Sequence, residues 1–364
     1  MSFIKKITIK GHKLRLFLFL ILIPCFVLAE IGTEDYRKYH STKSKFKLEK
    51  SAQGLNYPWA LTFIDKVNVL ITEKDGGLYK VNVLTGGKEK IKHEIAHIGY
   101  DGSGQGGLLD VYFYPPDGYV YFTYSHKSSK LTRSKQISKK SSTAIARGRL
   151  IENEIKDFEI LLIAKPEFLE NRHYGSRLAI KGDDLFASFG ERGQGMISQD
   201  STKHPGSIIR IKTNGEIPKD NPRFKGKKDW LPEIYVIGVR NPQGITISPH
   251  DEEVYFSSHG PRGGDHIGQV EFGSNYGWKD IAWGGREYYG LGIGDAPFKD
   301  KYKKPLISWV PSMGISSIQF YEGEAFPEWR GDLLVASLNG QSLIRLDVEK
   351  NKIVAKEIIF KDKI

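Results

Sequence analysis

The sequence predicts an all-β protein with a β-propeller architecture, and two observations support this prediction. First, one unit recurs along the chain: a short apolar strand, a turn of Gly, Asp or Pro, and a second strand rich in β-branched and aromatic residues. Second, no segment keeps the period of an amphipathic helix over several turns. The units start at irregular intervals of roughly 50 to 70 residues, which is typical of propeller blades rather than of a sandwich.

Five such units follow one another. Each pairs an apolar inner strand with a second strand, and the pairs are Trp59–Phe63 with Val69–Thr72, Gly107–Val111 with Tyr119–Phe122, Arg177–Ile180 with Asp184–Ala187, Gly244–Ile247 with Glu253–Phe256, and Ser317–Phe320 with Asp332–Val335. Third strands are expected at Gly77–Val81, Ser207–Ile211 and Ser342–Leu346. A sixth unit is expected to begin near the end of the chain, and Lys45–Glu49 is expected to be an outer strand that closes the ring.

Residues 1–29 have the three parts of a secretory signal peptide. Basic residues come first, the apolar run Leu16–Leu28 follows, and Ala29 ends a small-residue cleavage site before Glu30. The apolar run is too short for a comfortable bilayer span, so no stable membrane span is expected after cleavage. The sequence therefore predicts a signal peptide at 1–29, a linker at 30–44, a propeller domain at 45–364, and a periplasmic or secreted protein.

Composition narrows the function classes. The only cysteine, Cys25, lies within the predicted signal peptide, so the mature protein is expected to contain no disulfide and to depend on its core for stability. A chain of 364 residues that is 39% hydrophobic can bury a large core in one domain. Part of the net charge of +11 lies in the serine-rich stretch 126–149, which lacks interleaved aromatic residues. We expect a solvated loop there and no nucleic-acid partner.

Two short motifs suggest ligand chemistry. Arg240 stands where a predicted strand passes into a loop, and its planar guanidinium suits a carboxylate, although an arginine can equally tie two loops together. In Gly260-Pro261 the proline ring removes a backbone donor, so the turn presents carbonyl oxygens. Such oxygens are ligands for Ca²⁺, although many Gly-Pro pairs form only a turn.

Three blocks together resemble the glucose/sorbosone dehydrogenase family, the soluble aldose sugar dehydrogenases that use pyrroloquinoline quinone (PQQ). The blocks are Glu233–Gly244, Ser258–Asp265 and Gly273–Trp278, within a resemblance that covers about residues 55 to 360. The resemblance implies a six-bladed β-propeller, and we expect its last blade to be incomplete at the C-terminus. It also implies that the protein oxidises the anomeric hydroxyl of an aldose sugar to a lactone, with PQQ as hydride acceptor and an electron acceptor that the sequence does not identify.

The resemblance also implies a catalytic pair. His173, in His173-Tyr174-Gly175-Ser176-Arg177, matches the surroundings of the family's general base. Glu191, between Gly190 and Arg192, stands in a turn where the family has a carboxylate that holds this histidine. A carboxylate on one ring nitrogen fixes the tautomer and leaves the other nitrogen to accept a proton.

Further residues match the cofactor and metal positions of the family. Those implied to line the PQQ pocket are Gln105, Arg240, Asn241, His259 and Ser312. Those implied to bind Ca²⁺ are Gly260 and Pro261 beside the cofactor, with Asp265 and Tyr276 at a second, structural site.

Three departures from the family pattern concern charge. His266 replaces a Glu, Asn339 replaces a Lys, and a closing segment with two cofactor-binding arginines is missing. PQQ carries three carboxylates, and a buried anion needs compensating cations. A propeller that binds a carbohydrate or a protein without the cofactor is therefore an alternative. A calcium-dependent lactonase would need several acidic metal ligands, which the sequence does not offer.

Overall fold

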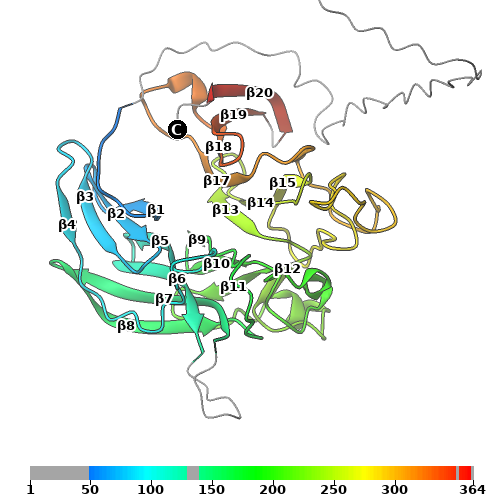
Figure 1. Cartoon of the computed structure of the whole chain (residues 1–364), viewed down its shortest axis with the longest axis horizontal. Coiled ribbons are helices and arrows are strands. Elements are labelled where there is room, and N and C mark those ends of the chain that lie inside the picture. The colour runs from blue at the N-terminus through cyan, green and yellow to red at the C-terminus, as the bar shows by residue number, and fades with distance from the viewer. Residues whose placement is uncertain (1–48, 129–138, 350–351, 362–364) are drawn as a thin grey trace, which may run out of the picture.

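Five four-stranded antiparallel sheets make up the described part of the chain. The structure, a computed structural model, describes residues 49–128, 139–349 and 352–361. The sheets are arranged like blades around a common centre (Figure 1). In each sheet the strands follow chain order, so each blade is a meander. The predicted all-β propeller is confirmed.

The five blades take their strands consecutively from the sequence. Blade 1 contains β1 (Pro58–Phe63), β2 (Asn68–Glu73), β3 (Leu78–Asn82) and β4 (Lys88–Lys90), and blade 2 contains β5 (Leu108–Tyr114), β6 (Tyr119–Lys127), β7 (Ser141–Ile151) and β8 (Glu154–Ile163). Blade 3 contains β9 (Leu178–Lys181), β10 (Asp184–Phe189), β11 (Ser207–Lys212) and β12 (Ile234–Ile237). Blade 4 contains β13 (Pro242–Ile247), β14 (Val254–Ser258), β15 (Asp265–Gln269) and β16 (Ile307–Trp309). Blade 5 contains β17 (Ile315–Phe320), β18 (Leu333–Ser337), β19 (Ser342–Glu349) and β20 (Lys352–Lys361). Short 3₁₀ helices interrupt the loops at η2 (Gly195–Gln199), η3 (Pro222–Lys225) and η4 (Pro327–Trp329).

The core lies between the blades. Neighbouring residues of a strand point to opposite faces, so Phe122 packs with blade 1 while Tyr121 packs with Leu185 of blade 3. Phe186, next to Leu185, packs with blade 4. Both faces of the middle blades are thus covered, which is why β6, β10 and β14 are buried along nearly their whole length. Each large side chain buried in this way contributes about 1.5–3 kcal/mol.

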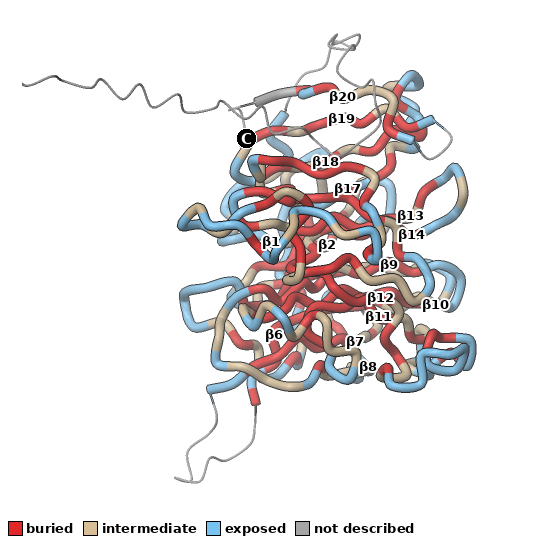
Figure 2. Tube along the Cα trace, turned by 90° about the vertical axis from the view of Figure 1, so that its right-hand side faces the viewer, coloured by how far each residue is buried: buried red, intermediate tan, exposed pale blue. Residues whose placement is uncertain are grey.

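Blade 5 is covered differently. Its strands β18 and β19 alternate between buried and half-buried residues, so only one of its faces is fully packed (Figure 2). The inner strands of consecutive blades contact one another from β1 and β5 to β13 and β17, whereas β17 and β1 make no comparable contact. The described residues therefore form five blades and not the six that we expected.

The stretch 126–149 corrects another expectation. It was predicted as a solvated loop, but its described parts belong mainly to β6 and β7. Ser, Thr and Ala side chains fill the buried half of β7, and Arg147 and Arg149 cover the ring of Tyr119 with their guanidinium carbons 4.2 and 4.0 Å from its centre. These arginines thus pack on the sheet and do not form a free basic patch.

Several predictions fall on residues that the structure does not describe. The signal peptide, the linker at 30–44 and all but Glu49 of the expected strand Lys45–Glu49 lie outside the described ranges. Within those ranges, no helix is both long enough and apolar enough to cross a membrane.

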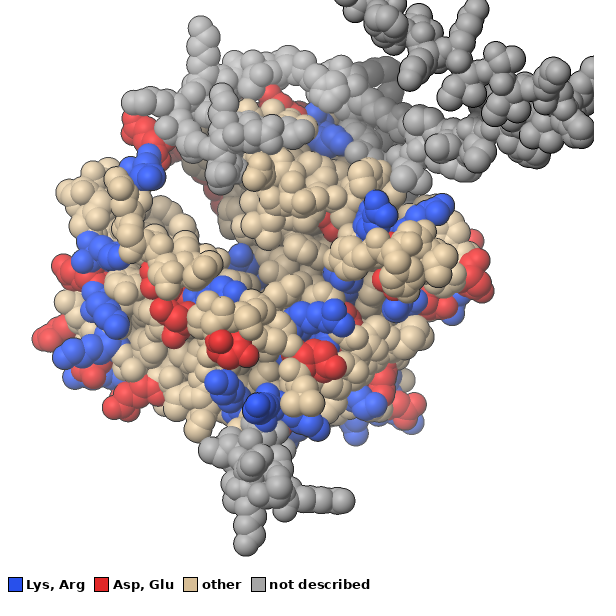
Figure 3. All heavy atoms as spheres, viewed as in Figure 1, with Lys and Arg blue, Asp and Glu red and all other residues tan. Residues whose placement is uncertain are grey.

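The inner strands of all five blades surround a central cavity of about 680 Å³. Figure 3 shows the molecule hollowed at its centre in this view, with acidic and basic side chains interspersed around it. Trp59, Leu61 and Phe63 of β1 line this cavity, and the Asp110–Arg177 ion pair borders it. The candidate functional site lies where the inner strands begin.

Candidate active site

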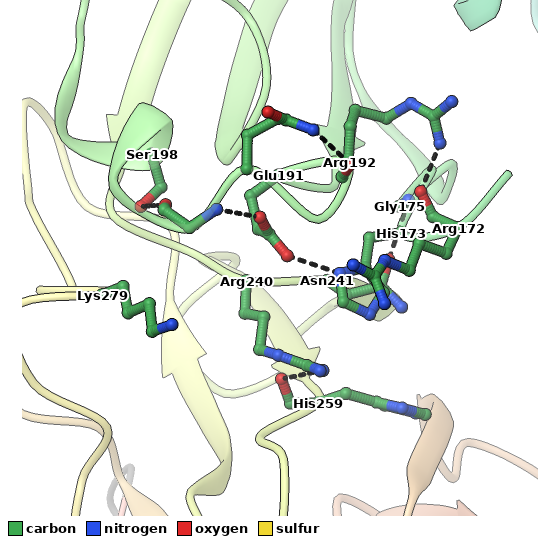
Figure 4. A network of polar contacts seen from close by, with 12 residues as sticks. Arg172, His173, Gly175, Glu191, Arg192, Ser198, Arg240, Asn241, His259 and Lys279 are labelled. Carbon is green, nitrogen blue, oxygen red and sulfur yellow. Dashed lines mark hydrogen bonds and ion pairs between the residues drawn. The ribbon is translucent and has the colours of Figure 1, made fainter. Parts of the chain in front are cut away.

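Three loops bring the predicted residues His173, Glu191 and Arg240 together at one rim of the propeller. His173 precedes β9, Glu191 follows β10, and Arg240 joins β12 to β13. The start of one antiparallel strand and the end of the next lie at the same edge, so these loops are neighbours. Backbone hydrogen bonds connect them, from Glu191 N to Arg240 O at 2.8 Å and from His259 N to Asn241 O at 3.2 Å. Figure 4 shows the side chains that these loops carry.

His173 and Glu191 form a buried pair. His173 Nδ1 lies 2.5 Å from Glu191 Oε1, and both side chains are almost fully buried. The other carboxylate oxygen accepts a hydrogen bond from Gly195 N. The backbone N–H of His173 donates to Gln105 Oε1 at 2.7 Å, which anchors the loop from blade 2. With Nδ1 engaged, Nε2 is the nitrogen that can accept a proton.

A glycine allows the two loops to approach this closely. A Cβ on Gly190 would lie 2.1 Å from the carbonyl oxygen of His173, so only glycine fits there. On the other side, the guanidinium of Arg177 donates to Gln243 O at 2.8 Å and pairs with Asp110 at 3.0 Å. The segment that carries His173 is therefore held from blades 2, 3 and 4.

The surroundings lower the pKa of both His173 and Glu191. Burial lowers the pKa of His173, the hydrogen bond that its Nδ1–H donates to Glu191 opposes this, and the charge of Arg240 lowers the pKa further. Burial would raise the pKa of Glu191, but the interaction with His173, the Gly195 N–H and Arg240 together bring it below its usual value. A neutral imidazole beside an ionised carboxylate is the arrangement that a general base requires.

Arg240 is a buried cation without an acidic partner. Its guanidinium donates to the carbonyl oxygens of His259 and Gly260 at 3.4 and 3.3 Å, and to the hydroxyl of Tyr288 at 3.4 Å. It also lies over the ring of Trp278, 5.4 Å from its centre. Among the described residues no carboxylate is within ion-pair distance of it. Such a cation is available to an anionic ligand.

Asp265 is fully engaged by the backbone. Its Oδ1 accepts from Gly260 N at 2.7 Å, and its Oδ2 accepts from the N–H groups of Met313, Gly314 and Ile315 at 2.9, 2.6 and 3.1 Å. These bonds fasten the Gly260 turn of blade 4 to the loop that opens blade 5. In this conformation the carboxylate serves as a clamp, and the described residues contain no cluster of three or more acidic, His or Cys side chains that could hold a metal ion.

The remaining predicted positions are engaged in different ways. Asn241 Oδ1 accepts from Gly175 N at 3.0 Å, so it supports the histidine loop. His259 Nε2 is buried with no hydrogen-bond partner among the described residues, and His259 lines a small cavity with Arg240. Ser312 Oγ accepts from Asp265 N at 3.3 Å. Tyr276 is buried in the core, where its carbonyl accepts from Trp283 Nε1 at 3.0 Å and its hydroxyl donates to Gln269 O.

Arg192 is a supporting residue that the sequence did not reveal. It is buried, donates to the carbonyl oxygens of Glu170 and Arg172, and lies over the ring of Tyr174 at 3.5 Å. It therefore ties the turn that carries Glu191 to the loop that carries His173. Its position beside Glu191 was the only signal, because the family motif leaves that residue unspecified.

The fold and the rim define a β-propeller with a buried histidine–carboxylate pair beside an arginine that has no acidic partner in the described part of the chain. The model of one protein family, the glucose/sorbosone dehydrogenases, matches residues 55–364. The chain belongs to this family.

Individual relatives agree with this placement. The aldose sugar dehydrogenase YliI of Escherichia coli is 32% identical over 321 residues, which cover 85% of this chain and 82% of that protein. The crystal structure of the soluble aldose sugar dehydrogenase of E. coli in its apo form superposes with a TM-score of 0.77 at 30% identity, over 86% of this chain and 89% of that one. The PQQ-bound aldose sugar dehydrogenase of Streptomyces coelicolor shares the fold, with a TM-score of 0.69 at 23% identity over 87% and 85% of the two chains.

Proposed function

We propose that this protein is a PQQ-dependent sugar dehydrogenase that oxidises the anomeric hydroxyl of an aldose to a lactone. One observation carries the proposal: the buried His173–Glu191 pair lies in one hydrogen-bonded network with Arg240, a buried cation with no acidic partner among the described residues. A base and an anion-binding group side by side suit a sugar substrate and a polycarboxylate cofactor. The aldose sugar dehydrogenase relatives, one of them PQQ-bound, support the same chemistry.

The residues of the chain account for the proton. His173 Nε2 accepts the proton of the sugar hydroxyl, and the neutral imidazole becomes imidazolium. Glu191 stabilises that charge through Nδ1 and keeps the ring in place, while Gln105 holds the backbone of His173. When bound, PQQ supplies the two-electron acceptor for the hydride from the anomeric carbon.

The residues present fit an anionic planar cofactor. Arg240 would bind a carboxylate of PQQ, and Gln105, Asn241, His259 and Ser312 would supply further polar contacts. Buried polar atoms normally have partners, yet His259 Nε2 and Trp278 Nε1 have none among the described residues. We retain calcium at the Gly260 and Pro261 carbonyls only, because Asp265 has no free oxygen and His266 Nδ1 faces the carbonyl oxygen of Gly264.

The proposal includes a sixth blade and an extracytoplasmic location. A sixth blade between blades 5 and 1 would cover the half-buried face of β18 and β19 and complete the ring. The signal peptide at residues 1–29 and the linker at 30–44 would direct the propeller to the periplasm or the medium.

The proposed function is tested by adding PQQ and CaCl₂ to the purified protein and measuring dye-linked oxidation of a panel of aldoses, with identification of the product. We expect turnover that depends on PQQ and releases a lactone. PQQ-independent binding of sugars without oxidation would favour the alternative, a propeller that binds carbohydrate without catalysis.

The pH dependence of kcat/KM should show the perturbed histidine. Only the neutral form of His173 accepts a proton, and burial lowers its pKa, so the acid limb should fall below pH 6.5, the ordinary value. Glu191 raises the pKa of His173 and Arg240 lowers it. Replacing Glu191→Gln should therefore move the limb to lower pH, and Arg240→Met should move it to higher pH. Limbs that coincide in all three proteins would contradict the assignment of His173 as the base.

A further inference from the structure

A second cation lies at the mouth of the site. Lys279 belongs to the long connection between β15 and β16 and follows Trp278, whose ring packs under Arg240. A Cβ placed on Gly195 would lie 3.0 Å from Lys279 Cδ, and Gly195 is the residue whose N–H binds Glu191. In Figure 4 the lysine extends toward the side of the site where Arg240 lies.

One hairpin contacts both cations. The bridge between Arg286 and Gly292 closes a turn in which Glu287 N donates to Leu291 O at 2.9 Å. Glu287 Oε1 lies 2.6 Å from Lys279 Nζ, and the hydroxyl of the next residue, Tyr288, accepts from Arg240. Consecutive residues of the hairpin thus place an oxygen on each cation of the site.

We propose that Lys279 is a second cationic contact for the carboxylates of PQQ. In the ligand-free protein, the carboxylate of Glu287 occupies the position on Lys279 that a ligand carboxylate would take. This inference rests on the proposed function. Exchanging the Glu287 carboxylate for a ligand carboxylate leaves the charge on Lys279 balanced, and Lys279 is 38% exposed, so a ligand can reach it. Lys279 thereby supplies part of the positive charge that the departure at Asn339 takes away.

The exchange predicts opposite effects for the two partners. Lys279→Gln should weaken PQQ binding about 10-fold, as expected for the loss of one charge-assisted contact, whereas Lys279→Arg should largely retain it. Glu287→Gln should tighten binding several-fold because it removes the competing carboxylate. In the Lys279→Gln background, Glu287→Gln should have no such effect. Isothermal titration calorimetry with PQQ, with and without CaCl₂, measures all five proteins.

Lys212→Gln is the matched control. Lys212 is 36% exposed, and its Nζ lies 2.8 Å from Oδ1 of Asp184. Asp184 begins β10 and Glu191 follows the end of this strand, so Lys212 lies at the opposite rim from Glu191. Its replacement should leave the Kd unchanged. Two outcomes would overturn the inference and leave the proposed function standing. One is that the wild-type protein binds PQQ and Lys279→Gln changes the Kd less than twofold. The other is that Glu287→Gln tightens binding equally in the wild-type and Lys279→Gln backgrounds. Absence of any PQQ binding by the wild-type protein would overturn the proposed function together with the inference.

Discussion

Replacing His173→Ala should reduce kcat by about 10²–10⁴-fold while leaving the Kd for PQQ nearly unchanged. The imidazole is the only group of the buried pair that can accept the hydroxyl proton, and its backbone contact to Gln105 does not depend on the side chain. The measurement is dye-linked sugar oxidation at saturating PQQ and CaCl₂, with the Kd determined separately by calorimetry. Wild-type turnover by this variant would exclude His173 as the base.

A second histidine–glutamate pair provides the control for this experiment. His204 Nε2 lies 2.6 Å from Glu233 Oε1, and His204 Nδ1 accepts from Lys165 N at 3.0 Å, so both ring nitrogens are engaged. This pair ties blade 3 to the end of β8 and has no nitrogen left for chemistry. His204→Ala should therefore lower the Tm but leave the kcat of the folded protein within about twofold of wild type.

Replacing Arg240→Met should weaken PQQ binding by about 10- to 100-fold without loss of thermal stability. A charge-assisted bond to a carboxylate contributes about 1.5–3 kcal/mol, which corresponds to that loss of affinity. In the ligand-free protein, the buried guanidinium has only long contacts to carbonyl and hydroxyl oxygens, so its removal relieves an uncompensated charge. We expect an equal or higher Tm by scanning calorimetry, together with the weaker Kd.

The comparison is Arg192→Met. Arg192 is also buried, but it satisfies the carbonyl oxygens of Glu170 and Arg172, which its removal would leave unpaired. This variant should lose Tm. If Arg240→Met lost as much Tm as Arg192→Met, the role of Arg240 would be structural rather than ligand binding.

The fold could be predicted from the sequence largely because each blade repeats a local pattern. The inner and second strands are short apolar runs bounded by turn residues, and all five predicted pairs are confirmed. Outer strands carry a weaker pattern. Glu154–Ile163, for example, contains a single buried residue and several charged ones, so β8 did not stand out. The Ser and Thr residues of β7 likewise have the composition of a loop, and only the structure shows that their side chains are buried.

The site was partly predictable for a similar reason. His173 and Glu191 were identified because each stands in a local motif, and the structure brings the two side chains into contact. The engagement of Asp265 was not visible, because three of its four donors come from the loop that opens the next blade. Lys279 had no local signal either, since the residue that it packs against, Gly195, belongs to another blade.

The residues for proton transfer and the residues for ligand binding are held by different blades. The histidine and its carboxylate both belong to blade 3, whereas Arg240, the Gly260 turn and Lys279 are held by the junction of blades 3 and 4 and by the loop fastened to blade 5. Loosening of the contacts between blades should therefore degrade ligand affinity before it disturbs the acid–base pair. Low concentrations of urea are expected to raise the Kd for PQQ while kcat at saturation is still unchanged. Recognition is a collective property of the ring, and proton transfer is the property of a single blade.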